Sequence, residues 1–335
     1  LNRAKREKRD EFYTPIEAVN EELGHYFKFF NGKTVYCNCD DPFESAFFKS
    51  IVLRFDLFGL KKFVSIVTRS SELAGTELPL TEIAGLKGVV SSPKDKPAFK
   101  IEITWDDLKS VASPDGVYNQ ESIKKLFRKN PNVVTPLDGD GDFRSQECID
   151  ILKTVDVVVT NPPFSLFREY FKQLIEHEKD FLILGSLNAV TYKDVFPYLK
   201  DVRVRLGFNA SSIEFKTAYG KSRTLNNTVW FTTFNIRRVK NPLLPVLKYD
   251  PEKYPKYDNY DAIEVSRVRN IPVDYDGIMG VPINYLLVHD PEQFEILGIS
   301  YAWCKEAHQF GAEKANEPIL KGKRIYKRVF IRRKK

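Results

Sequence analysis

The segment Val155-Asp-Val-Val-Val-Thr-Asn-Pro-Pro-Phe164 places an apolar run of strand length directly before an Asn-Pro-Pro-aromatic turn. A continuous apolar run of this kind is typical of a strand in a parallel sheet that is covered on both faces. Helical spacing follows at 167–177, and a second apolar run follows at 181–184. This succession of strand, helix and strand predicts an α/β fold with a mostly parallel sheet and helices on both faces.

Strand and helix patterns alternate over most of the first 240 residues. They predict strands at 34–39, 63–68, 133–137 and 225–234, and helices at 16–30, 44–55, 121–128 and 147–153. Gly, Ser, Pro and Lys dominate at 85–97, which indicates a loop or hairpin insertion within about 69–130. From about 240 the composition shifts to Pro, Tyr and Asp with little periodicity. We therefore expect one domain at 1–240 and an irregular region at 241–335 that packs on it.

The charge of the chain points to a polyanionic partner. Lys and Arg number 52 against 45 Asp and Glu, and the excess lies at 3–9 and at 321–335. Such runs are typical of nucleic-acid binders, although solvated tails are the alternative. The apolar residues interleaved at 325–331 make the C-terminal run resemble an edge strand. No apolar run approaches the roughly 20 residues that span a bilayer, so we expect a cytoplasmic protein that does not enter a membrane.

The cysteines and acidic clusters do not predict a metal site. Cys37 and Cys39 are too close in sequence for a zinc motif and no second pair matches them, so we expect buried, reduced thiols. Asp138-Gly-Asp-Gly-Asp-Phe-Arg144 superficially resembles a calcium loop. The twelfth position of that loop is Ile149, where a calcium loop requires Glu. We expect no metal.

The turn at Asn161–Phe164 is the main candidate for catalysis, because ligands of open α/β sheets bind beyond the carboxyl ends of the strands. Pro162 and Pro163 stiffen the turn. The side-chain oxygen of Asn161 and the carbonyl of Pro162 can each accept one hydrogen of an exocyclic amine, which stabilises the tetrahedral nitrogen formed during methyl transfer. Phe164 can stack on a base. A proline-rich turn without chemistry is the alternative.

Three further segments are candidates for binding a nucleotide-like cofactor. Phe12-Tyr13-Thr14-Pro15 precedes a helix, whose N-terminus favours a carboxylate. Cys37-Asn38-Cys39-Asp40-Asp41 ends a strand, and its aspartates can meet an amine or ribose hydroxyls. Asp142-Phe143 follows another strand and suits an adenine ring. Ordinary helix-start or turn chemistry is the alternative for each segment.

These segments, together with 254–263 and 277–283, resemble the EcoRI-type adenine-specific DNA methyltransferases over about residues 10–296. The resemblance implies a Rossmann-like class I fold, with 1–240 as the catalytic domain and 241–335 in contact with DNA. It implies transfer of a methyl group from S-adenosylmethionine to N6 of adenine in duplex DNA, with flipping of the base. The implied cofactor residues are Phe12, Tyr13, Thr14, Pro15, Cys37, Asn38, Asp40, Asp41, Asp142, Phe143 and Asn161. The implied catalytic residues are Asn161, Pro162, Pro163 and Phe164, and the implied substrate contacts are Phe164, Asn226, Asn227 and Trp230.

The resemblance also suggests a biological setting. We expect a monomer of bacterial or phage origin in a restriction-modification system, without direct contact with a cognate endonuclease. Segments 186–224 and the C-terminal tail depart from the family pattern, so no recognition sequence is predicted. The alternatives are an RNA or protein-glutamine methyltransferase of the same chemistry, and a DNA-binding protein with a decayed fold. The intact turn at Asn161–Phe164 argues against decay.

Overall fold

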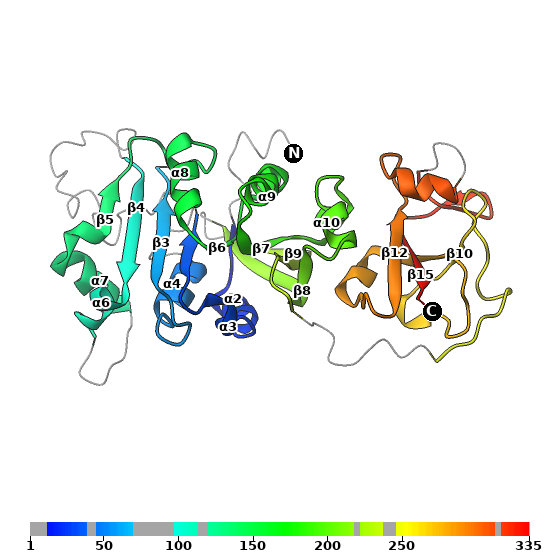
Figure 1. Ribbon diagram of the computed structural model, residues 1–335, viewed down its shortest axis with the longest axis horizontal. Helices are drawn as coiled ribbons and strands as arrows, with labels where there is room; N and C mark the ends of the chain where they lie inside the picture. Colours follow the sequence, from blue (N-terminus) through cyan, green and yellow to red (C-terminus); the bar gives the residue numbers. More distant parts are fainter. Residues whose placement is uncertain are drawn as a thin grey trace. The chain divides into compact units, whose positions relative to one another are not determined.

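The computed structural model describes residues 12–38, 45–69, 97–112, 120–217, 222–236, 246–311 and 316–334. The chain forms two compact units (Figure 1). The first unit comprises Leu1–Gly185 and Phe208–Phe234, and the second comprises Ser186–Gly207 and Asn235–Lys335. The second unit thus takes in 186–207, which the sequence patterns had placed within 1–240.

A nine-stranded sheet, counted over the described residues, forms the centre of the first unit, in the order β1-β8-β9-β7-β6-β2-β3-β4-β5 (Figure 1). Its middle strands β7, β6, β2 and β3 are parallel neighbours, as predicted, whereas β4 and β5 add antiparallel pairs at one side. The strand bounds are β1 (Phe12–Tyr13), β2 (Thr34–Cys37), β3 (Lys62–Val67), β4 (Phe99–Thr104), β5 (Val134–Pro136), β6 (Val157–Thr160), β7 (Asp180–Ser186), β8 (Arg205–Thr217) and β9 (Ser222–Thr232).

The helices of the first unit match the predicted positions with two differences: 16–30 divides into two helices, and the short helix α6 was not predicted. In α4, Ser45 begins the helix by accepting hydrogen bonds from the backbone N–H groups of Phe47 and Phe48, at 3.1 and 3.2 Å. Its apolar face is buried, and each such side chain stabilises the fold by about 1.5–3 kcal/mol. The bounds are α2 (Ile16–Leu23), α3 (Phe27–Phe30), α4 (Ala46–Val52), α6 (Trp105–Lys109), α7 (Gln120–Lys129), α8 (Gln146–Thr154) and α9 (Phe167–Glu176).

The second unit corrects the prediction of an irregular C-terminal region, because it contains a four-stranded sheet in the order β10-β11-β15-β12. The C-terminal strand β15 pairs antiparallel with both β11 and β12, so it is an interior strand and not the predicted edge strand. Its residues 329–331 are fully buried. The bounds are α10 (Phe196–Lys200), β10 (Ile263–Glu264), β11 (Met279–Pro282), β12 (Phe294–Ile299), β13 (Ile319–Leu320), β14 (Lys323–Arg324) and β15 (Arg328–Arg333).

None of the helices in the described ranges has both the length and the apolar character needed to cross a lipid bilayer. Cys37, Cys148 and Cys304 are buried free thiols, as predicted, while Cys39 lies outside the described residues.

Candidate active site

The carboxyl ends of β2 and β6 lie next to each other, because the two strands pair in parallel with Val35 opposite Val157. Asn38 follows β2 and Asn161 follows β6. The two ends are tied together, since Oγ1 of Thr160 donates a 2.7 Å hydrogen bond to the carbonyl of Asn38. The turn at Asn161–Phe164 therefore occupies the edge of the sheet where open α/β folds bind their ligands.

The side chain of Asn161 contacts the segment before α2. Its Nδ2 donates to Oγ1 of Thr14 at 3.3 Å, which brings together two candidate residues that are 147 positions apart in sequence. Thr14 is only 7% exposed. Because an amide group is planar, engaging Nδ2 on one side directs Oδ1 to the other side. This hydrogen bond therefore favours one orientation of the Asn161 amide.

The other residues of the turn are held by a backbone hydrogen bond to the residues that follow and by a ring contact with β8. Pro162 is buried, whereas Pro163 and Phe164 are partly exposed. The N–H of Leu166 donates to the carbonyl of Pro163 at 2.8 Å and closes a 3-10 turn. The ring of Phe164 meets the buried ring of Phe215 edge-on, with centroids 6.2 Å apart. A partly exposed ring fixed at its edge is suited to stacking on a flat ligand.

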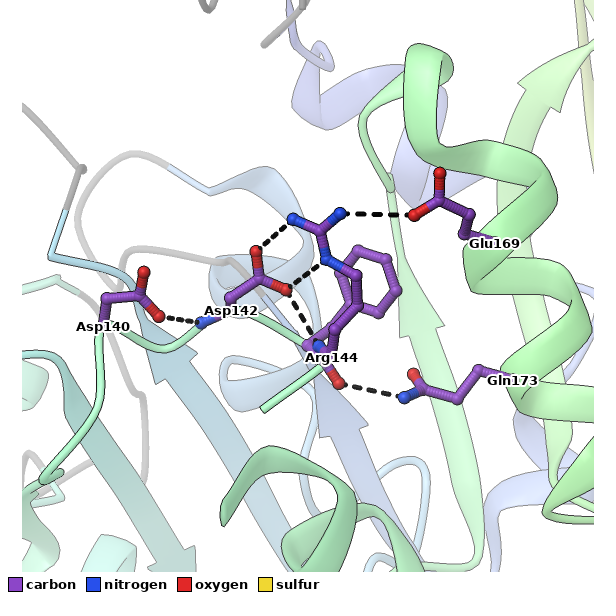
Figure 2. A network of polar contacts seen from close by, with 6 residues as sticks. Asp140, Asp142, Arg144, Glu169 and Gln173 are labelled. Carbon is purple, nitrogen blue, oxygen red and sulfur yellow. Dashed lines mark hydrogen bonds and ion pairs between the residues drawn. The ribbon is translucent and has the colours of Figure 1, made fainter. Parts of the chain in front are cut away.

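The turn after β5 forms a polar network with α9 (Figure 2). Arg144 grips Asp142 with two branches, Nε to Oδ1 at 2.8 Å and Nη2 to Oδ2 at 2.5 Å. The third branch, Nη1, reaches Glu169 of α9 at 3.2 Å. Gln173, one turn further along α9, donates to the carbonyl of Phe143 at 3.0 Å. Because α9 begins just after the Asn-Pro-Pro-Phe turn, this network links the Asp142 segment to the candidate catalytic turn.

Asp142 keeps some capacity to accept another hydrogen bond. A carboxylate offers about four acceptor positions. Among the described residues, Oδ1 accepts the N–H and Nε of Arg144, and Oδ2 accepts only Nη2. One position therefore remains on Oδ2, and the side chain is 31% exposed. The hydrogen bonds from Arg144 hold the pKa of Asp142 below its ordinary value, although partial burial acts in the opposite direction.

The ring of Phe143 is not open to a ligand. It is buried, it meets Tyr170 edge-on at 4.9 Å, and the guanidinium of Arg144 lies over it at 5.4 Å from the centroid. Stacking of this ring on an adenine, as predicted from the sequence, would require Arg144 to move. The side chain of Asp142 and the backbone around it are the accessible parts of this segment.

The backbone of the Asp142 turn is fixed by its neighbours. Glu147 of α8 accepts the N–H groups of Asp138 and Gly139, at 3.3 and 3.1 Å. Gly141 has a φ of +79°, and a Cβ added there would come within 3.0–3.1 Å of three neighbouring atoms. Only glycine satisfies both the positive φ and the close approach. The turn therefore holds the carboxylate of Asp142 in one place.

The sequence as a whole now identifies the class of protein. The model of a family described as adenine-specific methyltransferase EcoRI matches residues 1–334. The chain belongs to this family. It is 39% identical over 316 residues to the type II methyltransferase M.EcoRI of Escherichia coli, covering 89% of this chain and 88% of that protein. Type II methyltransferases of Mycoplasma genitalium and Mycoplasma pneumoniae are each 32% identical over 99% and 100% of this chain, and over 98% of their own lengths. The chain is thus an enzyme of the adenine-specific methyltransferase class.

Several residues predicted for this methyltransferase site lie elsewhere or outside the described part of the chain. Asp40 and Asp41 are outside the described residues, as are the side chains of Phe12 and Tyr13, whose backbone forms β1. Pro15 begins α2. Cys37 and Asn38 are buried at the end of β2.

The candidate substrate residues on β9 are divided by their burial. Asn226 and Asn227 are exposed. Trp230 is only 1% exposed and packs against Phe47 at 5.6 Å, so the structure places its ring in the core and not beside a ligand. The residue that does contact Phe164 is Phe215 of β8, which the sequence analysis missed. The alternation of apolar and polar residues at 212–216 was the available signal.

Proposed function

We propose that the chain transfers a methyl group from S-adenosylmethionine to the N6 amino group of adenine in duplex DNA, with Asn161 as the residue that binds the amine. The single observation that carries this proposal is the Asn161 amide at the carboxyl end of β6, with Nδ2 engaged by Thr14 and Oδ1 directed away from it. Membership of the adenine-specific family and the type II names of the relatives support the substrate class.

The structure fits the proposed cofactor at the Asp142 turn. The remaining acceptor position on Oδ2 of Asp142 is suited to the amino group of the cofactor's adenine. The hydroxyl of Thr14, which accepts from Asn161, keeps its own hydrogen to donate to a cofactor carboxylate. Asp40 and Asp41 remain proposed cofactor contacts on sequence grounds. When bound, S-adenosylmethionine supplies an activated methyl group on a sulfonium.

The protein's own groups act on the target amine. Flipping the base out of the duplex costs a few kcal/mol and exposes the amine to Oδ1 of Asn161 and the carbonyl of Pro162. Each oxygen accepts one N–H, which orients the nitrogen lone pair and stabilises the positive charge that develops on nitrogen. The N6–carbon bond forms as the sulfur–carbon bond breaks. One N6 proton then leaves for solvent, while Phe164 holds the plane of the base.

The proposal is tested with labelled methyl transfer to duplex DNA. We expect Asn161→Ala to lower kcat by about 10²–10³-fold, the usual effect of losing one transition-state contact. Calorimetry should show cofactor affinity close to that of the unsubstituted chain. Turnover of the variant near the normal rate would refute the role of Asn161. Parallel reactions with RNA and with a glutamine peptide test the alternative substrates, and methylation of either in place of DNA would refute the proposed substrate.

We further propose that the chain works as a monomer in the cytoplasm, within a restriction-modification system and without direct contact with the endonuclease. The type II names of the relatives support this setting. Sedimentation velocity with and without duplex DNA tests the oligomeric state, and a dimer at working concentration would contradict it.

A further inference from the structure

Seven of the nine Lys and Arg in the basic C-terminal run fall into two groups within the second unit. Of the nine Lys and Arg at 321–335, four are engaged within the protein. Their role is to hold the sheet and its neighbours together, so they contribute little to an external partner. The internal partners are Asn316 and Glu317 for Lys327, Glu264 for Arg328, Glu295 for Arg332 and the carbonyl of Pro272 for Arg333.

The second group is gathered on one hairpin. Lys321, Lys323 and Arg324 are exposed, and within the described residues none of their side chains has an ion pair or a hydrogen bond. Strands β13 and β14 pair through a two-residue turn, with Leu320 opposite Lys323. Because neighbouring residues of a strand point to opposite faces, Lys323 and Arg324 place positive charge on both faces of the hairpin, with Lys321 at its tip.

The tip has a residue that the turn itself does not favour. Lys321 and Gly322 have φ values of 50° and 74°, which make a turn that strongly prefers Asn-Gly or Gly-Gly. A lysine at the first position is strained, and such strain tends to occur where the side chain has a function. The strained residue, Lys321, is also one of the three hairpin cations that have no side-chain partner among the described residues.

The hairpin is held both at its base and at its turn. The N–H of Ile319 donates to Oδ1 of Asn259 at 2.8 Å, and the N–H of Gly322 donates to Oδ2 of Asp258 at 2.7 Å. Asp258 leaves the hairpin with a surplus of two positive charges, counting three cations against this one carboxylate. A braced hairpin loses little conformational freedom when it binds, which favours affinity.

From this arrangement we propose that the hairpin β13–β14 enters the major groove of the duplex substrate and neutralises phosphates on both walls with Lys321, Lys323 and Arg324. The inference rests on the proposed DNA substrate. The major groove admits a two-stranded ribbon, and cations on both faces of such a ribbon lie toward opposite phosphate backbones. Tyr326, which follows the hairpin in sequence, is 58% exposed, and its hydroxyl donates to Oδ1 of Asn188 at 3.4 Å.

The first test is the salt dependence of duplex binding by the full chain. Each phosphate contact contributes about 0.9 to the slope of log K against log salt, so each lost cation should weaken binding by about 8-fold at 0.1 M salt. The variant Lys321→Gly is the sharpest probe, because glycine relieves the strained φ while it removes the charge. We expect its melting temperature to stay level or rise while duplex affinity falls. Unchanged affinity would mean that the hairpin is only a charged edge, and would overturn the proposal.

The second test asks whether the contact with DNA is specific to the hairpin and where on the duplex the hairpin lies. Lys334→Ala removes an exposed cation outside the hairpin whose side chain has no ion pair or hydrogen bond in the part of the chain that the structure describes, so its salt slope should match that of the original chain. An equal loss of slope in this control would indicate a general basic surface and would contradict a hairpin contact. Photo-crosslinking from 5-bromouracil, moved along the duplex, should label peptide 319–326. Labels only elsewhere would overturn the groove placement. Methyl transfer by the original chain is measured alongside, and its absence would refute the proposed function and not the hairpin contact.

Discussion

Replacing Thr14 with valine separates two roles for the residue, orientation of Asn161 and direct binding of the cofactor. Valine keeps the shape of threonine but cannot accept the hydrogen bond from Nδ2 of Asn161, which spans 3.3 Å. A neutral hydrogen bond of this kind contributes about 0.5–1.5 kcal/mol. If that energy holds the amide in its productive orientation, kcat should fall by about 2- to 13-fold. Serine keeps the hydroxyl and should restore most of the rate.

The assay is single-turnover methyl transfer at saturating cofactor and DNA, with cofactor Kd measured separately by calorimetry. A positioning role predicts that Thr14→Val lowers the rate in the original chain but adds nothing in an Asn161→Ala background, since the amide is then absent. An equal loss in both backgrounds would refute the orientation of Asn161 by Thr14. A rise in cofactor Kd with an unchanged rate would assign Thr14 to cofactor binding alone.

Three further substitutions test contacts of the Asp142 turn and the stability of the fold. Arg144→Met should raise the pKa of Asp142 toward its ordinary value. It should also weaken cofactor binding by about 3- to 10-fold, which is the effect of losing one partly exposed charged contact. Calorimetric measurement of cofactor affinity at several pH values checks both effects. Gly141→Ala should lower the free energy of unfolding by about 1–3 kcal/mol, as measured in urea. This loss should exceed that of Gly32→Ala, because Gly32 also has a positive φ but has open space around an added Cβ. Burial lowers the pKa of His289 from 6.5 to about 4. The unfolded chain therefore binds a proton that the folded chain does not, so unfolding free energy should fall by roughly 3 kcal/mol as pH drops from 6.5 to 4. His289→Gln should flatten that pH profile, and an unchanged profile would contradict the assignment.

The parallel centre of the sheet was predictable because its strands are continuous apolar runs, and β6 ends in a turn whose prolines mark its position. Strand β8 was not predicted, since Gly207, Asn209 and two serines interrupt its apolar pattern. Its partner strands supply the hydrogen bonds and packing that the local sequence does not suggest. The interior position of β15 was likewise hidden, because its basic residues look solvent-exposed in sequence, whereas Arg328 is held by Glu264 at 2.7 Å.

Some of the predicted site residues could likewise be proposed from local sequence, whereas others depend on the fold. Asn161 and Asp142 could be proposed from the sequence because each follows a strand at the edge of the sheet where open α/β folds bind ligands. Trp230 was assigned to the base through the family resemblance of its segment, but from Thr228 onward the side chains of β9 are buried in the core. The clamp of Arg144 on Asp142 depends on a side-chain geometry that residue spacing does not reveal.

Two contacts of the candidate catalytic turn are related through the register between β1 and β8. Tyr13 pairs with Lys216 in an antiparallel ladder. Thr14 is the residue after β1, and Phe215 precedes Lys216 in β8, so a ladder continued by one residue would set the two opposite each other. Thr14 engages the amide of Asn161, and Phe215 meets the ring of Phe164. A slip of one residue would therefore displace the partners of both side chains at once, and would turn each strand's buried face outward. The β1–β8 pairing thus couples the orientation of the amide acceptor to the position of the stacking ring, although neither strand carries a residue of the catalytic turn.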